Sequence, residues 1–173
     1  RHRSGTDRVA EVADHLPCDI VVNLQGDEPL MDPDLIDRVV SAVRDDPEIY
    51  MASAKTPIRR TEDRENPNIV KVVTDREGFA LYFSRSPIPF YRDTPETQSV
   101  NKHLGFYAYP VHFLKVFSAL SPGPLESAEK LEPLRALENG FKVKVEETSF
   151  DSIEVDTPKD IQKVETLLGR HKP

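Results

Sequence analysis

The chain has little of what several classes of protein require. Its 173 residues contain one cysteine, Cys18, no tryptophan and seven glycines. One cysteine excludes an intramolecular disulfide and a multi-cysteine zinc site, and it suits a reducing compartment, so we expect a cytoplasmic protein. No apolar run approaches the roughly 20 residues of a membrane span, and no signal peptide is recognisable.

Positive charge is also scarce. The chain carries 23 basic and 30 acidic residues, with a net charge of −7. This balance argues against broad electrostatic capture of nucleic acid or of an anionic membrane surface. The length fits one domain with a single core.

The start of the chain lacks an element that an α/β fold normally has. A doubly wound sheet usually begins with a strand, a phosphate-binding turn and a helix, and none of these precedes Arg1. We therefore expect a domain without its usual nucleotide-gripping segment.

Hydrophobic periodicity predicts alternating helices and strands, which is typical of an α/β fold. The charged segment 59–68 has no periodicity and is predicted to be a loop, and Pro133 predicts a kink or restart near Leu131. The predicted helices are 6–16, 33–45, 111–119, 125–139 and 158–168. The predicted strands are 19–24, 50–58, 69–73, 79–83, 103–109 and 141–145, of which 69–73 and 79–83 form an antiparallel hairpin.

The strongest local signal is the run Ile20-Val21-Val22, which leads into Asn23-Leu24-Gln25-Gly26-Asp27-Glu28-Pro29. A β-branched run predicts a strand buried on both faces, and ligands bind beyond the carboxyl ends of such strands. Asp27 is therefore expected at the mouth of a crevice. Val155-Asp156-Thr157-Pro158 reads as a second strand end before a helix, and two carboxylates suit Mg²⁺. Asp156 is equally well explained as a capping or loop residue.

Other polar clusters have two interpretations each. Ser4-Gly5-Thr6-Asp7-Arg8 either offers groups to an anion at a helix N-terminus or is an ordinary cap. Lys102-His103 either presents donors to an acidic substrate or is structural. Arg85 and Arg92 either clamp a carboxylate or are surface charge. A last set is expected to form a solvated helix face: Glu126, Glu129, Glu132 and Arg135.

Seven motifs follow one another along the chain: Ser4-Gly5-Thr6-Asp7-Arg8, the run 23–29, Asn66-Pro67-Asn68-Ile69-Val70-Lys71-Val72-Val73, Ala80-Leu81-Tyr82-Phe83-Ser84-Arg85, Lys102-His103-Leu104-Gly105-Phe106-Tyr107, Pro124-Leu125-Glu126 with Glu129, Leu131, Glu132, Leu134 and Arg135, and Val155-Asp156-Thr157-Pro158. Taken in this order, they resemble the motifs of the 3-deoxy-manno-octulosonate cytidylyltransferases, the CMP-Kdo synthetases, from end to end of the chain.

This resemblance implies a Rossmann-like, doubly wound mixed sheet of the nucleotide-diphospho-sugar transferase type, with a small antiparallel β insert at about 69–109. It also implies an enzyme that joins CTP and Kdo into CMP-Kdo and pyrophosphate for lipopolysaccharide biosynthesis. Asp27 and Asp156 would hold Mg²⁺. The sugar pocket would be lined by Gln25, Arg85, His103, Tyr107 and Glu132, and the cytidine would face Ser4, Gly5 and Thr6.

The resemblance further implies a homodimer built around the β insert and the strand at 102–109. The family's N-terminal strand and its Leu-Pro-Gly-Lys loop are missing from residues 1–173, so we expect this fragment alone to have little activity. Two alternatives stay open. One is a cytidylyltransferase for another acidic sugar, such as 8-amino-Kdo or a nonulosonate, and the other is a noncatalytic sugar-binding or dimerisation fragment.

Overall fold

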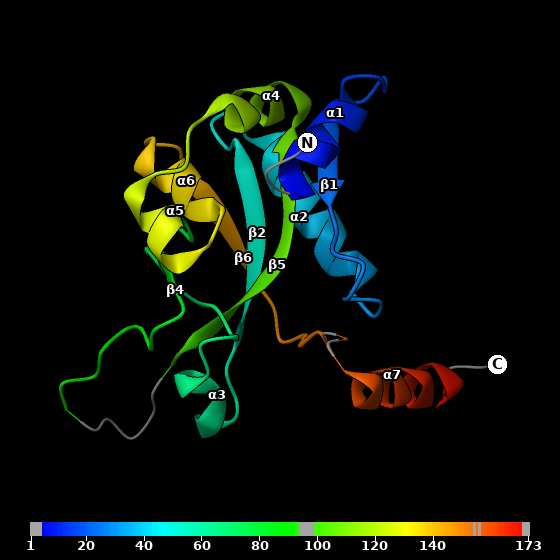
Figure 1. Cartoon of the computed structure of the whole chain (residues 1–173), viewed down its shortest axis with the longest axis vertical. Helices are drawn as coiled ribbons and strands as arrows, with labels where there is room; N and C mark the ends of the chain where they lie inside the picture. Colours follow the sequence, from blue (N-terminus) through cyan, green and yellow to red (C-terminus); the bar gives the residue numbers. More distant parts are fainter. Residues whose placement is uncertain (1–4, 94–98, 154, 156, 171–173) are drawn as a thin grey trace.

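The computed structural model describes residues 5–93, 99–153, 155 and 157–170 (Figure 1). The helices are α1 (Gly5–Ala13), α2 (Pro33–Asp45), α3 (Thr61–Glu65), α4 (Val111–Ala119), α5 (Pro124–Glu129), α6 (Pro133–Glu138) and α7 (Pro158–Arg170). The strands are β1 (Ile20–Asn23), β2 (Met51–Pro57), β3 (Lys71–Thr74), β4 (Ala80–Ser84), β5 (Asn101–Pro110) and β6 (Val143–Glu147).

The long strand β5 organises the sheet. In the described part of the chain six strands form one sheet, in the order β4-β3-β5-β2-β6, with β1 also paired to β5. β2 runs along one edge of β5, from residue 101 to residue 108. The other edge is therefore shared: β1 pairs with residues 107–110 and β3 with residues 101–102. β2 and β6 are parallel and all other pairs are antiparallel, which confirms a mixed sheet.

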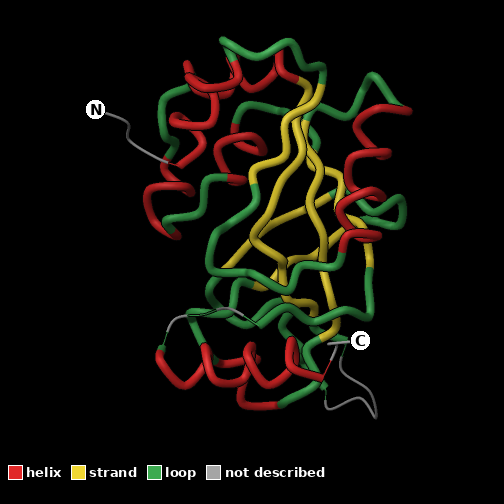
Figure 2. The backbone as a smooth tube through the Cα atoms, turned by 90° about the vertical axis from the view of Figure 1, so that its right-hand side faces the viewer, coloured by secondary structure: helices red, strands yellow, loops and turns green. Residues whose placement is uncertain are grey.

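Helices cover both faces of this sheet, as the view in Figure 2 shows. α2 packs its apolar stripe, Leu35, Val39 and Val43, on one face against small and aromatic residues of β2 and β5. Its N-terminus is capped by Asp32, whose carboxylate accepts a hydrogen bond from the amide of Asp34. The opposite face is covered by α1, α4 and α6 around an aromatic core that includes Tyr109, Phe113 and Phe117.

Most predicted elements are present, although several of their bounds differ. The loop predicted at 59–68 contains α3, a five-residue helix with no buried residue, which explains why it shows no apolar periodicity. The strand predicted at 141–145 begins at Val143 and continues to Glu147. The strand expected to end at Asp156 is wrong for the described residues, because Ile153 and Val155 lie in no strand.

The helix predicted at 125–139 is divided, as Pro133 predicted. α5 ends at Glu129 and is followed by the cap residue Lys130, whose φ of 57° places it in the left-handed region, and α6 starts at Pro133. Gly140 follows α6 with a φ of 79°, in the left-handed region that favours glycine after a helix.

β1 differs from the prediction of a strand buried on both faces, since Ile20, Val21 and Val22 are only partly buried. In the described structure β1 pairs with β5 alone. A groove of about 420 Å³ opens between α1 and β1 and is lined mostly by apolar side chains, together with Cys18. No helix among the described residues is long and apolar enough to cross a membrane.

Candidate active site

A cavity of about 220 Å³ lies at the gap that β1 and β3 leave along β5. It is lined by Gln25, Asp27, Glu28, Asn68, Val70, Arg85, His103 and Gly105. These residues come from the segment after β1, the segment before β3, the end of β4 and the middle of β5. Four of the predicted site residues therefore meet here: Gln25, Asp27, Arg85 and His103.

An irregularity in β5 shapes the floor of this cavity. Ala52 pairs with Ala108 and Ala54 with Leu104, so an advance of two residues along β2 corresponds to an advance of four residues along β5. The extra residues form a bulge, and bulges redirect side chains next to functional sites. The rings of His103 and Tyr107 come to lie 5.4 Å apart, centroid to centroid. Tyr107 is thus beside His103, within the main core cluster.

His103 is buried and uncharged. Its side chain is 7% exposed, and burial, with a smaller contribution from the charge of Lys102, lowers its pKa to about 3. Nε2 of His103 lies 2.8 Å from the Ser53 hydroxyl oxygen. Lys102 forms an ion pair with Asp151, at 3.3 Å. The two residues therefore do not act as a pair of cationic donors.

Two carboxylates stand side by side after β1. Asp27 is exposed at the cavity, whereas Glu28 is 4% exposed. Glu28 lies near Gly105: its Oε1 is 3.9 Å from the position that a Cβ atom on Gly105 would occupy. The burial of Tyr107 raises its pKa well above the usual value, and the neighbouring charges of Glu132 and Glu28 add to this rise. Glu28 is a site residue that the sequence interpretation did not single out, although its place directly after Asp27 was the available signal.

Arg85 is fixed by its neighbours at the side of the cavity. Its Nε donates to the carbonyl of Glu129 at 2.8 Å and its Nη1 to the carbonyl of Pro67 at 3.0 Å. Its backbone amide donates to the Glu129 carboxylate at 2.9 Å. The guanidinium is thus oriented before any ligand arrives, which suits binding of a carboxylate.

Lys71 ties together the two segments that flank Arg85. It is fully buried, and its Nζ donates to the carbonyls of Asn66, Ile69 and Arg85 at 2.9, 2.7 and 2.5 Å. All three ammonium protons are therefore used. Burial lowers the pKa of this lysine, while the charges of Glu65 and Glu129 oppose that shift.

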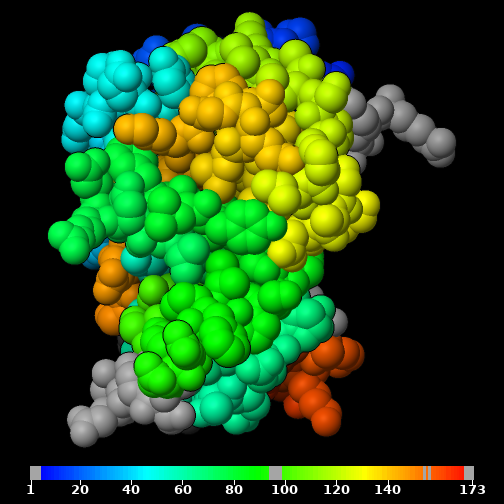
Figure 3. All heavy atoms as spheres, turned by 90° about the vertical axis from the view of Figure 1, so that its left-hand side faces the viewer, coloured from blue at the N-terminus to red at the C-terminus, as the bar shows by residue number. Residues whose placement is uncertain are grey.

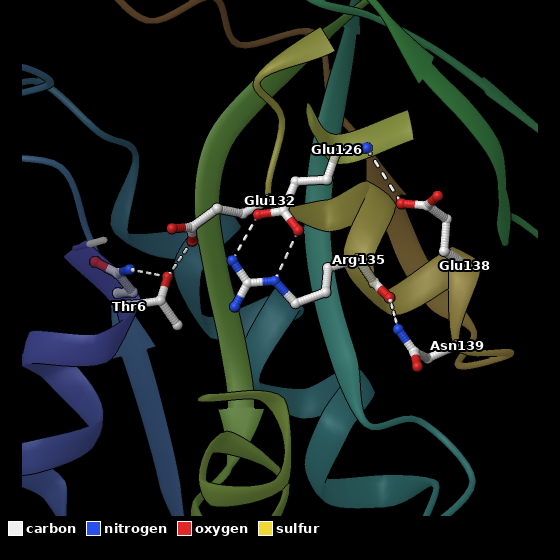
Figure 4. A network of polar contacts seen from close by, with 7 residues as sticks. Thr6, Glu126, Glu132, Arg135, Glu138 and Asn139 are labelled. Carbon is white, nitrogen blue, oxygen red and sulfur yellow. Dashed lines mark hydrogen bonds and ion pairs between the residues drawn. The ribbon is translucent and has the colours of Figure 1, made fainter. Parts of the chain in front are cut away.

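A second polar network joins α1 to α5 and α6 (Figure 4). The Thr6 hydroxyl donates to the Glu132 carboxylate, and Asn23 Nδ2 lies 3.5 Å from the same hydroxyl. Thr6 and Glu132, which the resemblance assigns to different substrates, are therefore in direct contact. Gly5 is the first residue of α1.

The acidic and basic residues of α5 and α6 are not the solvated face that their spacing suggested. Arg135 and Glu126 form a buried ion pair with contacts of 2.8 and 2.5 Å. Glu129 accepts hydrogen bonds from Ser84 and from the amide of Arg85. The division of the helix at Lys130 turns these side chains inward, a change that a straight helical projection does not include.

Ser4 and Asp156 lie outside the described residues. Val155, which directly precedes Asp156 in the sequence, donates its amide to the carbonyl of Asp27 at 2.8 Å. No group of three or more potential metal ligands is found within the described ranges.

Comparison with known proteins places this fold in a class. A putative glucose-1-phosphate thymidylyltransferase from Bacillus anthracis aligns with a TM-score of 0.63 at 15% identity, covering 100% of this chain and 63% of that one. A CMP:2-keto-3-deoxy-manno-octonic acid synthetase complexed with CTP aligns with a TM-score of 0.91 at 38% identity, over 99% of this chain and 70% of that one. The fold and the polar cavity define a sugar nucleotidyltransferase domain.

The sequence comparisons are more specific. The cytidylyltransferase family model matches residues 1–152. The 3-deoxy-manno-octulosonate cytidylyltransferase of Geobacter metallireducens is 51% identical over 98% of this chain and 70% of that protein, and the one of Geotalea daltonii is 53% identical over 94% and 68%. The chain belongs to the 3-deoxy-manno-octulosonate cytidylyltransferase family.

Proposed function

We propose that this protein transfers CMP from CTP to Kdo and releases pyrophosphate. Family membership and the similarity to a synthetase complexed with CTP support the reaction class. The observation that carries the proposal is the meeting of Gln25, Asp27, Arg85 and His103 around one small polar cavity at the end of β1. Such a set suits a sugar acid, whose hydroxyls and carboxylate need partners once they are buried.

The reaction is an in-line displacement. The anomeric hydroxyl oxygen of Kdo forms a bond to the α-phosphorus of CTP, the bond from that phosphorus to the pyrophosphate oxygen breaks, and the hydroxyl proton passes to solvent. Positioning and charge stabilisation supply most of the rate. Arg85 binds the sugar carboxylate, while Gln25 and His103 bind hydroxyls.

A divalent metal fits the donor set at the cavity. Asp27 is exposed there, and the Val155–Asp27 hydrogen bond ties the residue before Asp156 to Asp27. We assign Asp27 and Asp156 as ligands of Mg²⁺, which usually takes one or two protein carboxylates and completes its shell with water and phosphate. When bound, Mg²⁺ neutralises charge on the triphosphate.

The start of α1 is the proposed nucleotide side, with Ser4, Gly5 and Thr6 facing the cytidine. The Thr6–Glu132 hydrogen bond connects this side to α6, and the charge of Glu132 reaches Tyr107. We assign Tyr107 to the sugar pocket because its ring lies beside that of His103, and Glu132 because it accepts the hydrogen bond from Thr6 at the boundary of the two sides. The nucleotide and sugar sides are thus joined through one polar contact.

We also propose a homodimer, a role in lipopolysaccharide biosynthesis and a cytoplasmic location. β5 is enclosed by β1, β2 and β3, so the insert can offer a second copy only its outer part. In that part, Leu81 on the edge strand β4 and Phe90 in the segment after it are exposed. Figure 3 shows the side of the molecule on which the insert, coloured green, forms much of the surface. The location rests on the single cysteine and on the nucleotide substrate.

The proposal is tested by measuring pyrophosphate release by the protein expressed from its whole reading frame. We expect release that requires CTP, Mg²⁺ and Kdo together, that falls by at least about a hundredfold in Asp27→Ala, and that persists in the control Asp37→Ala on the exposed side of α2. Release only with 8-amino-Kdo or a nonulosonate would assign another sugar. No release with any of them would support a noncatalytic fragment.

A further inference from the structure

Ser53 is a fully buried residue of β2 that no motif singled out. Its hydroxyl oxygen lies 2.8 Å from Nε2 of His103. The same oxygen lies 3.0 Å from the carbonyl oxygen of Leu104 and 2.8 Å from that of Phe106. These two carbonyls belong to the bulged part of β5 that forms the floor of the cavity.

The position of the protons follows from this arrangement. A serine hydroxyl has one proton to donate, and a carbonyl oxygen can only accept. The Ser53 proton therefore points to the carbonyls of Leu104 and Phe106, because any other orientation would leave oxygen lone pairs facing each other. Ser53 consequently offers a lone pair to His103, so Nε2 must carry the hydrogen. In a neutral imidazole, Nδ1 is then the acceptor.

Nδ1 is the ring nitrogen that the Ser53 contact leaves available to a ligand. His103 lines the cavity, and its hydrogen bond to the described protein is made through Nε2. Some side-chain nitrogen and oxygen atoms of the described residues are buried without a hydrogen-bond partner, and Nδ1 of His103 is not one of them. The ring itself is held by Phe83, at 4.9 Å and nearly perpendicular, and by Tyr107.

We propose that Ser53 is a positioning residue that fixes His103 as the Nε2–H tautomer, so that Nδ1 accepts a hydrogen bond from a hydroxyl of the sugar acid. The inference rests on the proposed function and makes its site more specific. A carboxylate cannot donate to Nδ1, so His103 excludes the carboxylate end of the substrate from its side of the cavity. The carboxylate is directed to Arg85 instead.

The first test is spectroscopic and needs no turnover. Nitrogen-15 correlation spectra of histidine-labelled protein distinguish a protonated from an unprotonated ring nitrogen, and His103→Asn assigns the signal. We expect Nε2 to be protonated in the unchanged protein. In Ser53→Ala the packed ring stays in place but its buried N–H loses its acceptor, so the Nδ1–H form becomes populated.

The control is Ser118→Ala, which removes a hydroxyl that donates to the carbonyl of Leu114 in α4, away from the cavity. It should leave the His103 signals unchanged. An Nδ1–H tautomer in the unchanged protein would overturn the inference, and so would an unchanged tautomer in Ser53→Ala. The measurement on the unchanged protein decides the question even where Ser53→Ala does not fold.

The second test links the tautomer to the substrate. Addition of Kdo to the unchanged protein should shift the Nδ1 resonance and not the Nε2 resonance. In turnover, Ser53→Ala should raise the KM for Kdo by about tenfold, the equivalent of one hydrogen bond, with kcat and the KM for CTP within about twofold. A KM for Kdo that does not change would overturn the inference.

The two proposals fail separately. If the unchanged protein has the Nε2–H tautomer but releases no pyrophosphate with Kdo and does not bind it, the proposed function is wrong. If turnover with Kdo is normal and His103 carries its proton on Nδ1, only the role of Ser53 is wrong.

Discussion

Lys71 illustrates how single residues determine the shape of the site. A buried ammonium is costly unless its donors are satisfied, and here three carbonyls accept from it. Because these carbonyls belong to the segments on either side of Arg85, the lysine acts as a connector between them. Its sequence position inside a strand motif did not distinguish it from an ordinary solvent-facing lysine.

We expect Lys71→Met to lower the free energy of unfolding by about 2–4 kcal/mol, since three carbonyls lose a charged donor together. Urea unfolding measures this value. The control Lys115→Met removes an exposed ion pair with Asp14 and should cost less than about 1 kcal/mol. Equal effects of the two substitutions would contradict the connecting role of Lys71.

His103 should make the stability of the protein depend on pH in acid. Its pKa is about 3 in the folded chain and about 6.5 when unfolded, so the unfolded state binds more protons between these values. Stability therefore rises with pH through this window and is lost as the pH falls from 6.5 towards 3.

Between pH 7 and pH 4.5 we expect this residue to account for about 2 kcal/mol of lost unfolding free energy. The loss should shrink by that amount in His103→Gln and persist in His15→Gln, where the histidine is exposed. Parallel pH curves for the unchanged protein and His103→Gln would refute the assignment.

At the scale of elements, the ion pair between Glu126 and Arg135 fastens α5 to α6 (Figure 4). Both side chains are almost completely buried, and Arg135 also lies over the ring of Phe117 at 4.9 Å. Removing one member leaves an uncompensated charge in the interior, whereas removing both does not.

Glu126→Leu should therefore cost about 3–5 kcal/mol of unfolding free energy, and the addition of Arg135→Met should restore most of that loss. Thermal or urea unfolding of the single and double variants measures both values. A double variant that is less stable than Glu126→Leu would show that the arginine contributes through packing and not through the pair.

At the scale of the whole molecule, β4 is the last strand on one side of the sheet in the described part of the chain, so a second copy can pair with its outer edge. Leu81 is 62% exposed on this edge. We expect Leu81→Lys to weaken the proposed homodimer at least about tenfold, as measured by sedimentation equilibrium. Ile161→Lys, on α7 at the end of the molecule, is the matched control and should leave association unchanged. A protein that is monomeric at all concentrations would contradict the proposal.

Local patterns in the sequence determined the elements and the order of the motifs. Asp32 and Pro33 fixed the start of α2, Pro33 through Val43 supplied one apolar stripe, and Pro133 divided the helix between residues 125 and 139. These features depend on helix caps, on hydrophobic periodicity and on the backbone restrictions of proline. Each of these acts between residues that are close in the sequence, so the sequence alone predicts it.

Tertiary structure decided what the polar residues do. The contacts of Ser53 with His103, of Lys71 with Arg85 and of Thr6 with Glu132 join residues that are 50, 14 and 126 positions apart. The bulge in β5 and the shared edge between β1 and β3 created the cavity, and neither is visible in hydrophobic periodicity. Burial then made His103 neutral, because the free energy of a charge depends on its surroundings and not on its place in the chain.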